Sequence, residues 1–132
     1  GVDVHVAAWP GREPETAPSD PVWSRQVLLS RAFASAYGCY VIAAAGLRNF
    51  EHTPEHLRAA GRFEHNGHSR IIDPFGEVIA SAGAEETMLV VEADAKKIAM
   101  AKIACDPTGH YSRPDLFELR LRGKRIFGDG EA

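Results

Sequence analysis

Two cysteines and six histidines are the side chains of this sequence best suited to act as nucleophiles, bases or metal ligands. Cys39 lies within the apolar run CYVIAAA, where a cysteine is expected to be a small buried hydrophobe. Cys105 and His110 could form a thiol–imidazole pair. A reactive cysteine needs an electropositive setting, however, and the neighbouring Asp106 disfavours the thiolate. The sequence therefore predicts no catalytic nucleophile in this chain.

Four of the histidines have the close spacing that zinc ligands on a helix face can have. They are His52, His56, His65 and His68. No cysteine joins them, and the glutamates around them are expected to be solvated loop charges, so metal ligation is the less favoured interpretation. We expect no metal and no other cofactor.

The first half of the chain has the pattern of a strand, a helix and a second strand. Residues 1–10 form an apolar run that predicts a central strand covered on both faces. Apolar residues recur every three to four positions over residues 22–37, which predicts a helix that ends at Gly38, with Ser19 or Asp20 as its cap. Residues 39–45 predict a second buried strand. The three together form a βαβ unit with a right-handed crossover.

The second half predicts shorter elements. They are a short helix over residues 54–60, a hairpin of residues 69–73 and 77–82 around Pro74-Phe75-Gly76, a strand over residues 87–93, a helix from Ala95 to about Ala104 capped by Asp94, and an extended segment over residues 116–121. The tail after Gly123 is charged and is expected to be mobile. This order predicts an α/β fold with a mixed sheet flanked by helices.

Composition narrows the class of protein. A length of 132 residues suits one domain, and a net charge of −3 gives no indication of nucleic acid or an anionic membrane as a partner. No apolar run is long enough to cross a bilayer, and no secretion signal opens the chain. Two cysteines favour a reducing, cytoplasmic setting. Because Gly1 opens directly on a strand pattern, we expect the chain to be a fragment.

Four stretches together resemble the nitrilase branch of the carbon–nitrogen hydrolase superfamily. They are GVDVHVAAWP at residues 1–10, SRAFASAYGCYVIAAAG at residues 30–46, GHSRIIDPFGEVIASAG at residues 67–83 and DPTGHYSRPDLFELRL at residues 106–121. The run Asp-Pro-x-Gly-His-Tyr-x-Arg-Pro-Asp in the last stretch is the most specific, and it is typical of nitrilases and cyanide-converting relatives. One departure is Ala36-Tyr37-Gly38, where many relatives carry Glu-Gly.

The resemblance implies the C-terminal half of an αββα sandwich, here residues 1–132, that assembles as a homo-oligomer. It implies a cysteine, glutamate and lysine triad acting on a nitrile or amide substrate, and in the family's order all three precede Gly1. Alternatives are a cyanide or nitrile hydratase, an amidase, and a non-catalytic subunit or dimerisation module. A chain without the triad is expected to be inactive alone.

The resemblance also implies three candidates for the substrate pocket. Trp9 ends a strand of a parallel pair, where open α/β folds bind ligands, although a purely structural role in the core is equally compatible. His110 and Tyr111 could line the mouth of the site or fix the C-terminal segment. Arg113 and Asp115 are expected to pair with each other or with a neighbouring chain.

Overall fold

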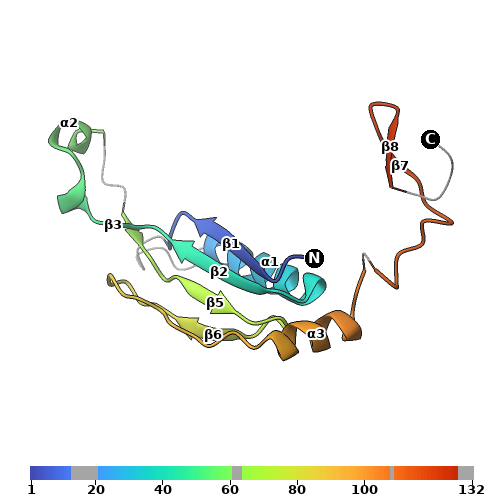
Figure 1. Cartoon of the computed structure of the whole chain (residues 1–132). Coiled ribbons are helices and arrows are strands. Elements are labelled where there is room, and N and C mark those ends of the chain that lie inside the picture. Colours follow the sequence, from blue (N-terminus) through green and yellow to red (C-terminus); the bar gives the residue numbers. More distant parts are fainter. Residues whose placement is uncertain (13–20, 61–63, 108, 128–132) are drawn as a thin grey trace.

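The computed structural model describes residues 1–12, 21–60, 64–107 and 109–127. Its centre is a mixed four-stranded sheet in the order β1-β2-β5-β6 (Figure 1). Strands β1 (Val4–Trp9) and β2 (Tyr40–Ala45) are parallel, whereas β5 (Arg70–Ile72) and β6 (Val78–Ser81) continue the sheet in antiparallel pairs. This is the α/β architecture that the sequence predicts.

The predicted βαβ unit is confirmed. Helix α1 (Pro21–Tyr37) connects the parallel strands. The helix ends where predicted, because Gly38 adopts a left-handed φ of 57° and Cys39 N donates to Ala34 O at 3.1 Å. The predicted caps Ser19 and Asp20 lie outside the described residues.

The core lies between α1 and one face of the sheet. One cluster joins Ala34 of the helix to Cys39, Val41 and Ile72, and a second cluster contains Trp9, Trp23 and Ala43. Cys39, Val41 and Ala43 lie at alternate positions in and just before β2 and so point to the same face, because successive side chains of a strand point to opposite faces. The sequence pattern thus places one apolar row of β2 against the helix.

The expectation that residues 1–10 form a central strand covered on both faces is wrong for the described chain. Strand β1 lies at the edge of the sheet, paired only with β2. Val4 and Val6 are 47% and 67% exposed, and Ile42, the register partner of Val6 on β2, is 40% exposed. The apolar run correctly indicated a strand, but a helix on one face leaves the other face open.

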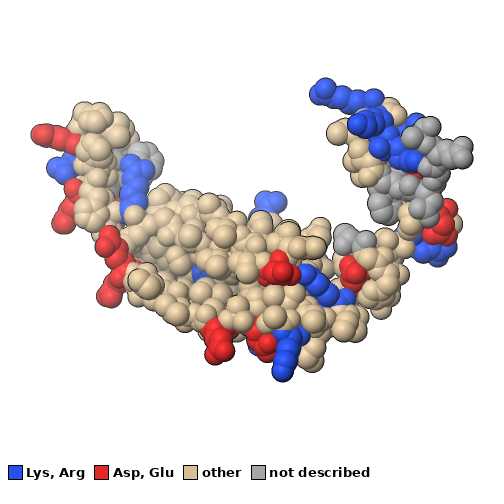
Figure 2. Space-filling view, in the orientation of Figure 1, with Lys and Arg blue, Asp and Glu red and all other residues tan. Residues whose placement is uncertain are grey.

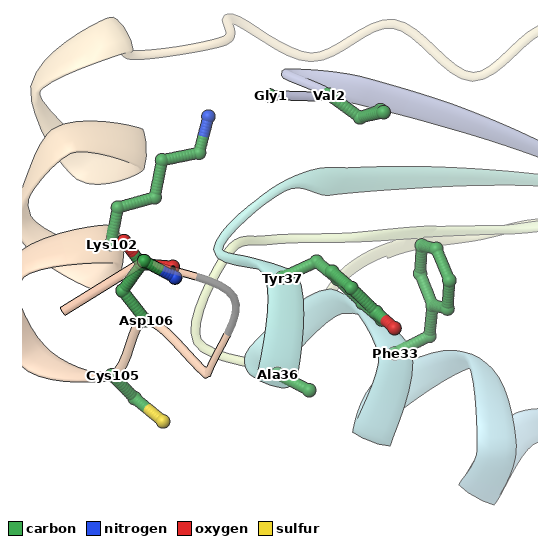
Figure 3. A pocket seen from close by; sticks show the side chains of 9 residues that line it. Gly1, Val2, Phe33, Ala36, Tyr37, Lys102, Cys105 and Asp106 are labelled. Carbon is green, nitrogen blue, oxygen red and sulfur yellow. Dashed lines mark hydrogen bonds between the residues drawn. The ribbon is translucent and has the colours of Figure 1, made fainter. Parts of the chain in front are cut away.

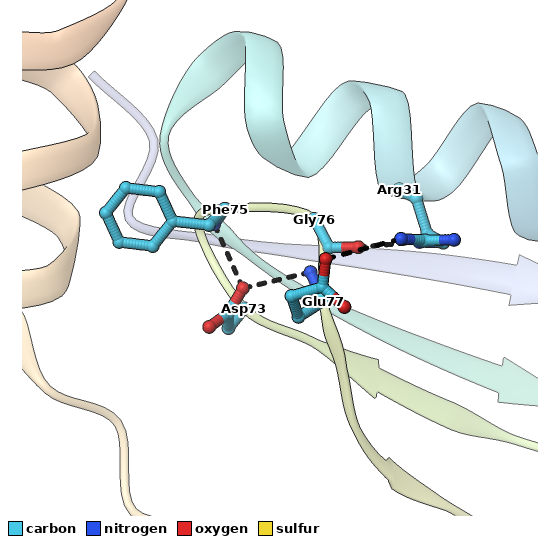
Figure 4. A network of polar contacts seen from close by, with 5 residues as sticks. All are labelled: Arg31, Asp73, Phe75, Gly76 and Glu77. Atoms are coloured by element: carbon cyan, nitrogen blue, oxygen red, sulfur yellow. Dashed lines mark hydrogen bonds and ion pairs between the residues drawn. The ribbon is translucent and has the colours of Figure 1, made fainter.

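The predicted hairpin of β5 and β6 is confirmed, and one carboxylate organises its turn. Asp73 Oδ1 accepts hydrogen bonds from Phe75 N and Glu77 N, both at 3.0 Å. Gly76 has a φ of 84°, and its carbonyl accepts a 2.7 Å hydrogen bond from Arg31 Nε of α1 (Figure 4). The turn is therefore fixed to the helix that covers the sheet.

The predicted strand over residues 87–93 does not form within the described chain. The segment keeps the alternation of a strand, since Met88 and Val90 are exposed while Leu89 and Val91 are half-buried. No described strand pairs with it. A strand needs a hydrogen-bonded neighbour, which the amino-acid pattern cannot supply.

The predicted helix from Ala95 to about Ala104 is confirmed as α3 (Ala95–Ala104). Asp94 caps it, because Asp94 Oδ1 accepts a hydrogen bond from Lys96 N at 2.8 Å. Asp94 N also donates to Tyr40 Oη of β2 at 2.9 Å, and Lys97 Nζ contacts the buried Asp73 carboxylate at 2.8 Å. These contacts hold α3 at the end of the sheet where β2 begins.

Two arms extend from this body (Figure 1). One contains β3 (Leu47–Arg48), a 3-10 turn (Phe50–His52), the predicted short helix α2 (Glu55–Arg58) and β4 (His65–Asn66). The other follows α3 and ends in the hairpin of β7 (Leu119–Leu121) and β8 (Lys124–Phe127). The expected mobile tail is thus a strand as far as residue 127. None of the described helices is long and apolar enough to cross a membrane.

Candidate functional site

Three loops meet at the carboxyl ends of the parallel strands β1 and β2. Gly46 N donates to Trp9 O at 3.0 Å, and Gly67 N donates to Gly46 O at 3.1 Å. Asn66 N reaches Arg12 O at 2.6 Å. Ligands of open α/β sheets bind at the carboxyl ends of strands. We therefore take this junction of loops as the part of a ligand-binding site that the described chain contributes, and call it the site edge.

Glycine is required where the loops after β1 and β2 cross. Gly11 has a φ of 97°, and a Cβ built on it would lie 2.1 Å from Gly46 O. No other residue can occupy this position without moving the backbone. Ser69 adds a side-chain tie, since its Oγ accepts a 2.9 Å hydrogen bond from Ala45 N at the end of β2.

Trp9 lies at this junction and is buried. It is 7% exposed and meets Trp23 of α1 edge to face, with ring centroids 4.9 Å apart. The centroid of His68 lies 6.0 Å from that of Trp23. His68 also has a φ of 65°, an uncommon conformation for a residue with a side chain, and one that costs about 1–3 kcal/mol. Trp9 therefore supports the backbone of the site edge from the core side.

A cavity lies at the opposite end of β1. It has a volume of about 510 Å³ and lies between the last turn of α1 and the end of α3 (Figure 3). Aromatic walls come from Phe33 and Tyr37, and the polar side comes from Lys102 and Asp106, with the Cys105 thiol at the rim. Such a lining suits an apolar group with a polar end.

Electrostatics at this cavity are those of a solvent-exposed ion pair. Lys102 Nζ lies 2.8 Å from Asp3 Oδ1 and lowers the pKa of that carboxyl, first through the hydrogen bond and then through its charge. His110 Nδ1 lies 3.9 Å from Asp106 Oδ2. His110 thus faces a carboxylate, and no contact joins it to the Cys105 thiol among the described interactions.

The structure does not bring the three predicted pocket residues together. Trp9 closes the carboxyl end of β1, whereas the segment with His110 and Tyr111 follows α3, which lies at the strand's other end. A six-residue strand is about 20 Å long, so the two places are separated by roughly that length. The rings of His110 and Tyr111 contact each other in a tilted arrangement, with centroids 4.3 Å apart and an interplanar angle of 42°, and both residues are exposed.

The two cysteines have different surroundings in the structure. Cys39 is fully buried, and this burial raises the pKa of its thiol. Cys105 is free and exposed. No group of three or more potential metal ligands occurs among the residues that the structure describes, so His52, His56, His65 and His68 form no such cluster there.

Three residues important for the site edge escaped the sequence analysis, namely Gly11, Gly46 and Ser69. Ser69 belongs to the stretch 67–83 that resembles the family, but the sequence does not show that its hydroxyl accepts a hydrogen bond from Ala45 N of β2, 24 positions earlier. Nothing local to Gly11 predicts that a carbonyl 35 residues later will lie against it.

The family model of carbon–nitrogen hydrolases matches residues 1–103, and the chain belongs to this family. Its sequence is 37% identical to a nitrilase from an unknown prokaryotic organism, over 99% of this chain and 41% of that protein. It is 33% identical to a nitrilase from Pseudomonas syringae, over 88% of this chain, and 33% identical to a cyanide hydratase from Botryotinia fuckeliana, over 95%. Each of these two matches covers 37% of the relative.

Solved structures agree on the fold. A carbon–nitrogen hydrolase from Helicobacter pylori matches with a TM-score of 0.63 at 20% identity, over 87% of this chain and 39% of that one. A Saccharomyces cerevisiae member of branch 10 of the nitrilase superfamily matches with a TM-score of 0.56 at 25% identity, over 82% and 35%. The fold is thus that of the nitrilase superfamily, and the chain spans about two fifths of the length of the curated relatives it matches.

Proposed function

We propose that this chain is the C-terminal part of a single carbon–nitrogen hydrolase domain in an enzyme that converts a nitrile to a carboxylic acid and ammonia. The observation that carries the proposal is the 37% identity to a nitrilase over almost the whole chain. The run of residues 106–115, beyond the family-model match, supports a nitrilase over an amidase. We further propose that the enzyme is a homo-oligomer, that it acts in the cytoplasm and that it needs no cofactor.

The chemistry is assigned to residues that precede Gly1 in the complete enzyme. A cysteine thiolate adds to the nitrile carbon and forms a thioimidate, with the proton delivered to nitrogen by a glutamic acid. Water then adds to the same carbon. Loss of ammonia leaves an acyl-enzyme, which a second water hydrolyses to the acid and the free thiol. A lysine stabilises the negative charge that develops on the substrate.

This chain contributes one wall of the site and its support. In the proposal, the loops after β1 and β2 border the substrate, and Trp9 holds them from the core side through its contact with Trp23. His110 and Tyr111 remain candidates for the mouth of a pocket. Because they lie about a strand length from Trp9, they would reach such a site from a neighbouring copy.

Ammonia release from a small panel of nitriles tests the proposal. The 132-residue chain is compared with a longer form that includes the upstream coding sequence. We expect activity only in the longer form, and we expect it to disappear when the upstream cysteine is replaced by alanine. Activity in the chain alone would contradict the assignment and would direct attention to Cys105 and His110.

A second reaction is favoured by the cyanide hydratases among the relatives, which are up to 33% identical. The thioimidate can add water and expel the thiolate instead of ammonia, and the product is then an amide. Mass spectrometry of the product separates the two reactions, since the acid and the amide differ in mass and only the acid accompanies ammonia. An amidase would consume the amide as substrate.

A non-catalytic subunit or dimerisation module is the remaining alternative. The cavity that Cys105 borders has Lys102 and Asp106 in its lining but no glutamate. Coding sequence that continues upstream of Gly1 without a stop would support the enzyme. A stop codon there, with a separate gene for the cysteine-bearing part, would support the subunit.

A further inference from the structure

The hydrogen-bonded ladder between β2 and β5 continues beyond the central sheet in the same register. Ala43 of β2 faces Arg70 of β5, and Leu47 of β3 faces Asn66 of β4. Both strands advance by four positions between these two pairs, so no residue is inserted or lost. The chain thus forms one antiparallel ribbon, which leads from the sheet to the arm with α2 (Figure 1) and is interrupted where β2 ends.

One step of this ribbon lacks its ladder hydrogen bonds. The shared register sets Ala45 opposite His68, but the two amides donate elsewhere. Ala45 N donates to Ser69 Oγ at 2.9 Å, and His68 N donates to Gly83 O at 3.0 Å. A serine hydroxyl therefore takes the place of a backbone carbonyl as the acceptor for the last residue of β2.

The interruption carries backbone strain that the pairing of the strands does not require. Gly67 and His68 both have a φ of 65°, a conformation that glycine adopts freely and histidine rarely. Because the register is the same on both sides, an extended His68 would continue the ladder without changing the register of either strand. Strain of this kind persists only where the surrounding structure imposes it, and it collects at functional sites.

The interruption lies at the site edge and is joined to it by neutral groups. Ala45, which Ser69 holds, precedes Gly46, whose amide donates to Trp9 O at 3.0 Å and whose carbonyl accepts from Gly67 N at 3.1 Å. Figure 2 shows few charged side chains over the middle of the sheet on the face that it draws. The position of the loops after β1 and β2 thus depends on a chain of hydrogen bonds that includes one side-chain hydroxyl.

We infer that Ser69 is a positioning residue of the site edge and that, by holding the end of β2, it helps to determine which nitriles the enzyme accepts. Without this hydroxyl Ala45 N has no acceptor in the ribbon, so the end of β2 and the loops that border the substrate shift. All the contacts involved join described residues within one chain, so the inference does not depend on what covers the outer faces. It rests on the proposed nitrile hydrolysis and deepens it by naming a determinant of substrate choice.

Amide hydrogen exchange of the complete enzyme tests the hydrogen bond without any measurement of activity. Ser69→Ala should speed exchange of the Ala45 amide by about tenfold or more, measured by mass spectrometry with fragmentation to single residues. Ser69→Thr keeps a hydroxyl and should exchange like the natural protein. Ser81→Ala is the matched control, because Ser81 Oγ accepts a 3.0 Å hydrogen bond from Arg70 Nη1 but holds no backbone group of β2. Equal exchange of Ala45 in Ser69→Ala and in the natural protein would overturn the inference.

Kinetics of the complete enzyme with two nitriles test the effect on specificity. Propionitrile and benzonitrile differ in the bulk of the group beside the reacting carbon. In Ser69→Ala the ratio of their kcat/KM values should change by about fivefold or more, mainly through KM, because displaced loops alter the space for the substrate and leave the upstream cysteine in place. A variant that is only less stable loses active protein and lowers kcat for both nitriles by the same factor. Ser69→Thr and Ser81→Ala should keep the natural ratio.

Ser69→Cys is a second variant in case the alanine variant does not fold, since a thiol has a similar shape but is only a weak acceptor. It should speed exchange of the Ala45 amide and change the ratio in the same direction as Ser69→Ala. An unchanged ratio in both variants, or an equal change in Ser81→Ala, would contradict the role in specificity. A natural enzyme that hydrolyses neither nitrile would contradict the proposed function instead, and the exchange measurement would still decide whether Ser69 positions the end of β2.

Discussion

At the residue scale, the close crossing of the loops after β1 and β2 leaves no room for a side chain at Gly11. Gly11→Ala places a Cβ 2.1 Å from Gly46 O at a φ of 97°. We expect the free energy of unfolding to fall by about 2 kcal/mol or more, measured by urea denaturation. Gly83→Ala is the control, because a Cβ there meets nothing within 4 Å and should change stability little. If Gly11→Ala and Gly83→Ala lowered the free energy of unfolding equally, the close approach of the two loops would be contradicted.

Asp73 joins three elements through one buried carboxylate. Burial raises the pKa of Asp73, but the hydrogen bonds from Lys97 and from the backbone of Glu77 and Phe75 outweigh this, so the pKa lies below its usual 3.8. A carboxyl whose pKa is lowered by folding adds stability above the unfolded pKa, and this stability is lost as pH falls through the folded value. Asp73→Asn should therefore destabilise the protein by about 1–3 kcal/mol at neutral pH.

The difference between the natural protein and Asp73→Asn should shrink as pH falls below the usual carboxyl pKa, measured by thermal unfolding over a pH series. Asp115→Asn is the matched control, since Asp115 pairs with Arg113 at 2.6 Å on the exposed C-terminal arm. It should leave the unfolding temperature unchanged at every pH, because exposed ion pairs add little. A constant difference for Asp73→Asn would show that its carboxyl charge is not what stabilises the turn.

At the element scale, the β7–β8 hairpin carries a suboptimal turn. Its two central residues, Arg122 and Gly123, have φ values of 51° and 80°. Two-residue hairpins with positive φ at both positions favour Asn-Gly, because asparagine tolerates this conformation better than arginine does. Arg122→Asn should slow amide hydrogen exchange in β7 and β8, measured by NMR or mass spectrometry. Arg122→Val should accelerate this exchange. If the asparagine variant exchanged faster than the valine variant, the positive φ of residue 122 would be contradicted.

At the scale of the whole molecule, the open sheet face decides how the chain behaves alone. Val4, Val6 and Ile42 expose an apolar surface that α1 cannot cover. We expect the isolated 132-residue chain to self-associate or precipitate, measured by light scattering. Val6→Lys should raise its solubility, yet should inactivate the complete enzyme if a second sheet covers this face. A monodisperse natural chain that melts cooperatively would contradict the expectation.

Family membership and most elements were determined by the sequence, because both depend on short-range pattern. Periodicity indicated α1, β1, β2, the β5–β6 hairpin and α3, and capping chemistry located Asp94 and Gly38. These features need no knowledge of distant residues. The four ordered motifs similarly indicate a carbon–nitrogen hydrolase, because each is a local run of residues.

Tertiary structure alone decided which strands have partners and which residues meet. Among the described residues, strand β1 lies at an edge of the sheet and residues 87–93 pair with no strand. Trp9 is separated from His110 and Tyr111 by about the length of a strand. The ties from Ser69 to Ala45 and from Lys97 to Asp73 each span 24 positions. Local propensity cannot encode such contacts, because they depend on how the whole chain places its backbone groups in space.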